Sequence, residues 1–189
     1  MCYTEITPRL LVGGWVGQQL FVNMLARADV THIVNMRHDR VGEMVGKQFK
    51  VLECEDAELD SFLPAAFWCK VFDFTAKAYK SKDNKIYFHV PARQHPESPV
   101  GCYAGLRSVG FTAIQARLKL EDAHPILAWH ETAMKSVETA FTHWCKQTGK
   151  NPETVRQAMS ERMKAIVAKH TVKEAPFTFA ARAASSAVV

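Results

Sequence analysis

Short apolar runs of β-type residues alternate with segments of helical spacing along the first half of the chain, and this alternation constrains the fold more than any other feature. The spacing predicts helices over residues 16–28 and 64–80, and the charged, glycine-containing residues 37–47 are expected to form a loop. Each helix carries the chain back to the edge where the next strand begins, so the strands are expected to pair in parallel. The predicted strands are residues 9–14, 31–36, 49–54 and 85–90.

The second half of the chain has a helical pattern throughout. Ser98 and Pro99 suit the start of a helix, with serine as the N-cap and proline in the first turn. The sequence therefore predicts an α/β domain over residues 1–150, with a small, mainly parallel sheet of about four to five strands flanked by helices. Residues 151–189 are expected to add a basic helix and a flexible tail rich in Ala and Ser. The helices expected in this half are residues 98–109, 112–120, 129–147 and 151–170.

Apolar side chains at helical spacing define the expected core. In the first helix Leu20, Phe21, Met24 and Leu25 share one face, which should pack against the sheet. Aromatic residues of the later helices occupy similar positions and are interpreted as packing residues. They are Phe67, Trp68, Phe72, Phe74, Trp129, Phe141 and Trp144.

Composition excludes several classes of protein. The chain has 189 residues, a net charge of +5 and five scattered cysteines, without a CxxC pair or zinc-ligand spacing. A disulfide scaffold and a structural zinc module are therefore excluded, and no metal site is predicted. Charged residues interrupt every apolar run and no signal peptide is visible, so the predicted location is cytoplasmic, without a membrane partner.

Five segments follow one another in an order and spacing that carry a resemblance. The first is ITPRLLVGG, the second LARADVTHIVNM, the third CEDAELD, the fourth KIYFHV and the fifth SPVGCYAGLRSVG. The series resembles the dual-specificity (tyrosine-type) protein phosphatase family over residues 6–147. In that family the corresponding parts are the first strand, a helix end with its strand, the general-acid loop, the strand before the phosphate loop and the helix after it. The resemblance implies a phosphatase-like fold and no cofactor.

The phosphate-loop signature itself is degenerate. The family's chemistry uses His-Cys, five residues, then Arg and Ser or Thr, where a thiolate attacks phosphorus and arginine binds the phosphoryl oxygens. Here His89 is kept, but Val90 stands at the position of the nucleophile. Counting from Val90 places Pro96 at the arginine, whereas alignment on Ser98 places Glu97 there. The resemblance therefore implies a pseudophosphatase.

The residues between strand and helix also suit phosphate poorly. Prolines at positions 91 and 96 remove two backbone N–H donors, and no glycine supplies the left-handed conformations of an anion-binding nest. Glu97 near the helix start would compete with a phosphate dianion for the helix dipole. Loss of phosphatase chemistry is expected on these grounds as well.

Structural roles suit the other possible nucleophiles and the motif histidine better than catalytic ones. Cys102 and Arg107 lie within a predicted helix, where side chains five residues apart diverge, so Cys102 is interpreted as a buried thiol. Ser98, near His95, is interpreted as a helix cap. His89 is interpreted as a buried, hydrogen-bonded residue beneath the loop.

Acidic and cationic side chains near the altered loop are the remaining candidates. Asp56 matches the family's general-acid position, with Asp60 as an alternative in the same segment, although both also suit a solvated turn. Ligand binding is predicted for four polar residues that project from the altered loop or begin the next helix, although an exposed polar loop without a function suits the loop residues equally well. They are Arg93, Gln94, His95 and Ser98.

Three functions follow from these residues. The first is a catalytically inactive binding or regulatory module for a phosphorylated or acidic partner, or a phosphate-bearing ligand. The second is an enzyme of altered chemistry, in which His89, His95, Ser98 or Asp56 acts on a phosphate-containing small molecule or nucleotide. The third is a nucleic-acid-associated factor that uses the basic residues 135–173, which is disfavoured because no recognition motif accompanies them.

Overall fold

A mostly parallel sheet of five strands forms the centre of the computed structural model. The structure describes residues 3–14, 16–36, 41–54, 62–90, 98–123 and 129–150. The strand order is β1-β2-β5-β3-β4, in which β1 pairs antiparallel with β2 and the other neighbours pair in parallel. The strands are β1 Tyr3–Thr7, β2 Leu10–Gly13, β3 His32–Asn35, β4 Lys50–Glu53 and β5 Ile86–His89.

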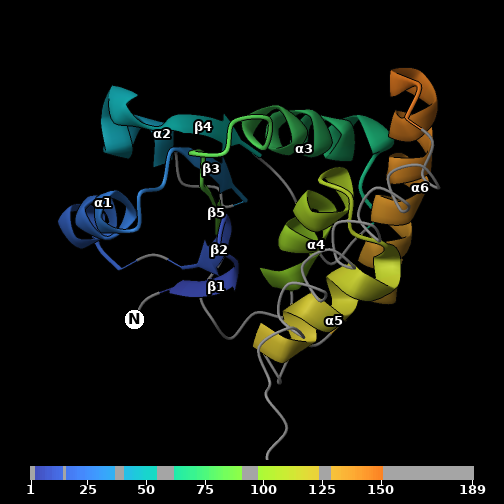
Figure 1. The fold of residues 1–189 in the computed structure, drawn as a ribbon, viewed down its shortest axis with the longest axis horizontal. Helices are drawn as coiled ribbons and strands as arrows, with labels where there is room; N and C mark the ends of the chain where they lie inside the picture. The colour runs from blue at the N-terminus through green and yellow to red at the C-terminus, as the bar shows by residue number, and fades with distance from the viewer. Residues whose placement is uncertain are drawn as a thin grey trace, which may run out of the picture.

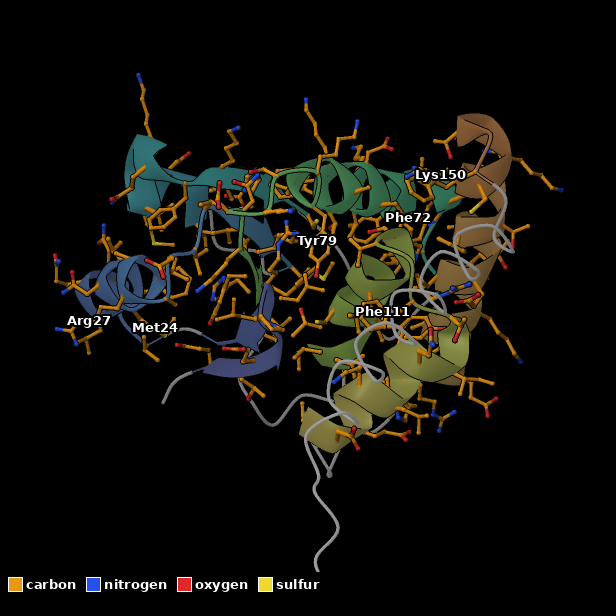
Figure 2. All side chains as sticks on the ribbon, in the orientation of Figure 1. Met24, Arg27, Phe72, Tyr79, Phe111 and Lys150 are labelled. Carbon is orange, nitrogen blue, oxygen red and sulfur yellow. The ribbon has the colours of Figure 1, made fainter. Side chains whose placement is uncertain are left out.

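Helices cover both faces of this sheet, as Figure 1 shows. Helices α1 and α2 lie on one face, and α3, α4 and α6 pack together on the other, with α5 beside α4. Figure 2 shows Phe72 where the second group meets, and its ring lies 5.6 Å from that of Phe141 and 5.4 Å from that of Trp144. The helices are α1 Gln18–Arg27, α2 Val41–Val45, α3 Ala65–Ala78, α4 Ser98–Ser108, α5 Ala113–Ala123 and α6 Glu131–Thr148.

The alternation of side chains along each strand separates two cores. In β5, Ile86 and Phe88 point into the cluster shared with α3, α4 and α6, whereas Tyr87 joins the cluster beneath α1 and α2. Successive side chains of a strand point to opposite faces, so a strand covered on both sides is apolar throughout. This requirement explains why continuous apolar runs in the sequence predicted the parallel strands.

Helix α4 approaches the sheet closely through two glycines on one face. A Cβ atom added at Gly105 would lie 2.4 Å from Cζ of Phe88, and one added at Gly101 would lie 2.0 Å from Sδ of Met36. Any larger residue would therefore displace these buried side chains. The glycines fix the position of α4 against the ends of β3 and β5.

Most of the expected elements are confirmed, with three corrections. Residues 37–47 were wrongly expected to form a loop: α2 and a 3-10 turn, Gly46–Gln48, occupy most of this stretch. Strand β1 is separate from β2 and was not predicted, because only Ile6 is buried in it. Leu20 was placed wrongly on the core face: its side chain is 67% exposed, whereas Phe21 and Leu25 are buried.

The expected basic helix over residues 151–170 and the tail lie outside the described residues, and the division at residue 150 stays a prediction. The packing role of the aromatic residues is confirmed, since Trp68, Phe72, Phe141 and Trp144 are buried and the other three pack against them. Within the described ranges, the helices are too short or too polar to cross a membrane.

Candidate functional site

The degenerate phosphate-loop signature begins at the carboxyl end of β5. Val90 follows His89 directly, and its backbone N–H donates to the carbonyl oxygen of Gly13 at 3.1 Å. Its isopropyl group is 2% exposed and belongs to the core cluster that includes Met36 and Val100. The position that the resemblance assigns to the nucleophile thus holds an alkyl group packed in the core. An alkyl group cannot form a phosphoenzyme.

His89 is wholly buried on the α1 side of the sheet. Its Nδ1 atom lies 2.9 Å from Oδ1 of Asn35. Its ring packs against the ring of Phe21, with the centroids 4.9 Å apart, and stacks on Tyr87 at 6.3 Å. The interpretation of His89 as a buried, hydrogen-bonded residue is confirmed. Burial of the ring does not favour the acid–base role that the enzyme alternative gives to His89, and that role stays a prediction.

A hydrogen-bonded row of side chains extends from His89 across the sheet. Asn35 Nδ2 donates to Oε2 of Glu53, and the backbone N–H of Gly42 donates to Oε1 of Glu53 at 2.6 Å. The three side chains come from β5, β3 and β4, at positions that are direct partners in the sheet register. Sequence reasoning missed Asn35 and Glu53. The available signal was that a polar residue is the last but one in each of three apolar runs.

All four cysteines that the structure describes have raised thiol pKa values. Burial raises the pKa of Cys54 to about 12, with a further contribution from the Glu53 carboxylate. Burial alone raises the pKa of Cys102, a residue of α4 whose side chain is completely buried. Burial is also the main cause of the raised pKa of Cys69 and of Cys145. A nucleophilic cysteine needs a lowered pKa, so these thiols are suited to packing.

Cys102 and Arg107 do not form a displaced phosphate site. The Arg107 guanidinium contacts Glu138 of α6, whereas Cys102 faces the core. The interpretation of Cys102 as a buried thiol on the core face of the helix is confirmed.

Several of the predicted site residues lie outside the described residues, and their roles stay predictions. Ser98 is the first residue of α4, as expected for the helix start, and only its backbone is described. Among the residues that the structure does describe, His, Cys, Asp and Glu form no group of three that could hold a metal ion. The candidates outside the described residues are Asp56, Asp60, Arg93, Gln94, His95, Pro96 and Glu97.

Comparison with solved structures relates this arrangement to known proteins. No family model matches the sequence, and no curated protein matches it significantly. The fold is similar to PTPMT1 in complex with PI(5)P, with a TM-score of 0.63 and 11% identity over 78% of this chain and 99% of that one. It is also similar to Tk-PTP in its active form, with a TM-score of 0.60 and 13% identity over 75% of this chain and 97% of that one.

Human DUSP28 gives a TM-score of 0.59 with 18% identity, over 76% of this chain and 95% of that one. These similarities cover most of both chains, although few residues are shared. The chain therefore has the fold of the dual-specificity and tyrosine phosphatases.

Proposed function

We propose that this protein is a catalytically inactive, phosphatase-like binding module that recognises a phosphorylated or acidic partner. The observation that carries the proposal is the buried Val90 at the position of the nucleophile. Phosphoryl transfer through a covalent intermediate needs a group that can attack phosphorus, and valine has none. The raised pKa values of the described thiols support the same conclusion, because no described cysteine is activated to replace it.

Binding is proposed at the carboxyl edge of the parallel strands. Ligands of open α/β sheets bind outside the carboxyl ends of their strands. Residues 91–97 follow β5 in the sequence, and Arg93 and His95 are the side chains in them that suit an anionic group. The fold shared with a PTPMT1 complex that contains PI(5)P makes phosphoinositide headgroups reasonable probes beside phosphopeptides.

Isothermal titration with phosphotyrosine and phosphothreonine peptides, with acidic peptides and with soluble PI(5)P tests the proposal. Arg93→Ala should weaken binding at least tenfold, because a charge-assisted hydrogen bond contributes about 1.5–3 kcal/mol. The matched control is Arg27→Ala. Arg27 lies in the last turn of α1, which leads to the amino end of β3 and not to the carboxyl edge where binding is proposed (Figure 2). Equal loss in both variants, or no binding of any probe, would contradict the proposal.

A further inference from the structure

Three neighbouring parallel strands end in polar residues that lie side by side. Asn35 of β3 is the register partner of both Glu53 of β4 and His89 of β5. The strands are adjacent in the sheet, as Figure 1 shows. Asn35 and His89 are wholly buried, so their hydrogen bonds are made without competition from water. Within this row, the donor and acceptor groups of each side chain therefore constrain the direction of its hydrogen bonds.

The carboxylate of Glu53 sets that direction at one end. The backbone N–H of Gly42 donates to Oε1 of Glu53, so this oxygen is an acceptor. A carboxylate has no proton to donate through its other oxygen. Asn35 must therefore present its NH2 group to Oε2 of Glu53, which is the arrangement observed.

The amide of Asn35 passes this direction to His89. When the NH2 group faces Glu53, the carbonyl oxygen Oδ1 faces the imidazole, 2.9 Å from Nδ1. An amide oxygen only accepts hydrogen bonds, so the proton must belong to the ring nitrogen. A neutral histidine in this place carries its proton on Nδ1, and Nε2 is its basic nitrogen.

We propose that Glu53 is a positioning residue that, acting through Asn35, holds the neutral His89 imidazole in the Nδ1–H form. His89 immediately precedes Val90, the position that the resemblance assigns to the nucleophile, so the row fixes the ring of the residue next to that position. Neither Glu53 nor Asn35 needs to contact a ligand in this role. The inference rests on the hydrogen bonds alone and holds whether or not the site binds phosphate.

Long-range 1H–15N NMR of the imidazole nitrogens tests this assignment directly, at a pH where His89 is neutral. In the wild-type protein we expect a pyrrole-like resonance for Nδ1 and a pyridine-like resonance for Nε2. The reverse pattern in the wild type would overturn the proposal without any variant being made.

Glu53→Gln should reverse the tautomer. The Gly42 N–H holds the new amide oxygen, so the new NH2 group faces Asn35 and turns the Asn35 carbonyl away from His89. The Asn35 NH2 group then faces Nδ1, which must accept, and the proton moves to Nε2. A Glu53→Gln protein that keeps the wild-type pattern would show that Glu53 does not set the tautomer.

The double substitution Asn35→Asp and Glu53→Gln should restore the Nδ1–H form. The carboxylate then lies next to His89 and accepts its Nδ1 proton, while the new amide at position 53 donates to the same carboxylate. The matched control is Glu131→Gln, an exposed residue in the first turn of α6, which should leave the His89 resonances unchanged. If Glu53→Gln does not fold, the wild-type spectrum still tests the proposal, because a proton on Nε2 of His89 would overturn it. If the row had only a structural role, these substitutions would lower stability, but the His89 tautomer would neither reverse in Glu53→Gln nor return in the double variant.

Discussion

The guanidinium of Arg107 and the carboxylate of Glu138 meet at two points, with Nε 2.6 Å from Oε1 and Nη2 2.9 Å from Oε2. The pair joins α4 to α6, and the Tyr103 hydroxyl donates to the same carboxylate at 2.6 Å. Burial, followed by this contact with Glu138, raises the pKa of Tyr103. Arg107 also lies over the ring of Phe141, 4.0 Å from its centroid. This cluster holds the helix after the candidate site against the rest of the helical layer.

Glu138→Gln should destabilise the protein by about 1–3 kcal/mol, because it removes the charge that pairs with a nearly buried guanidinium. The value lies below that of a fully buried pair, since the Glu138 side chain is 37% exposed. Chemical denaturation measures the change. Glu121→Gln is the matched control: its partner Arg117 is 56% exposed, and the loss should stay within about 1 kcal/mol. Equal effects of the two substitutions would contradict the structural role of the cluster.

Gly105→Ala should lower stability by about 1–3 kcal/mol despite the better helix propensity of alanine. The added methyl group would meet the Phe88 ring, which is wholly buried and cannot move aside freely. Phe88→Leu removes the ring atoms that cause the clash. A double-mutant cycle of the two substitutions should therefore give a favourable coupling energy. Additive effects would mean that Gly105 does not determine the approach of α4.

His32 should make stability depend on pH. Burial, and then the charge of Lys50, lower its pKa below the ordinary value of 6.5. The unfolded chain therefore takes up the proton at a higher pH than the folded protein does. Stability associated with this residue is present above about pH 6.5 and is lost as the pH falls toward the lowered folded pKa.

His32→Gln should reduce this acid-side loss, measured as denaturant midpoints across the same pH range. The control is His143→Gln, because His143 is exposed on α6. If both variants follow the pH profile of the wild type, burial of His32 has no energetic consequence.

The described cysteines should react slowly with iodoacetamide in the native protein. Cys54 and Cys102 are buried and their pKa values are raised, so little thiolate is present and access is poor. Mass spectrometry after timed labelling assigns the rate at each position, and labelling in denaturant provides the comparison. Rapid native labelling of Cys102 would reopen its role as a nucleophile.

The sequence predicted the sheet better than the short irregular elements, and the physical reason lies in burial. Strands β3 and β5 are covered on both faces, so the apolar runs THIVNM and KIYFHV identify them without knowledge of their neighbours. Strand β1 instead pairs with β2, and α2 buries Val41 and Val45 and contacts β4 through the Gly42 N–H and Glu53. Such elements are specified by tertiary contacts that a linear pattern does not contain.

The same distinction applies to the candidate site. The buried roles of His89 and Cys102 followed from their positions in a strand end and a helix. The connection from His89 through Asn35 to Glu53 required the register between three strands, which residue spacing does not specify. Each of these residues is nevertheless the last but one of an apolar run. A polar residue at that place in adjacent parallel strands is a usable signal for a hydrogen-bonded row.

Phosphate release from a generic aryl phosphate, compared between the wild type, Asp56→Ala and Glu131→Ala, tests the central claim most directly. Asp56 is the predicted general acid, and Glu131 is an exposed control on α6. With Val90 buried at the nucleophile position, we expect the three proteins to release phosphate at the same background rate. Release by the wild type and Glu131→Ala that Asp56→Ala abolishes would contradict the assignment of an inactive phosphatase-like protein.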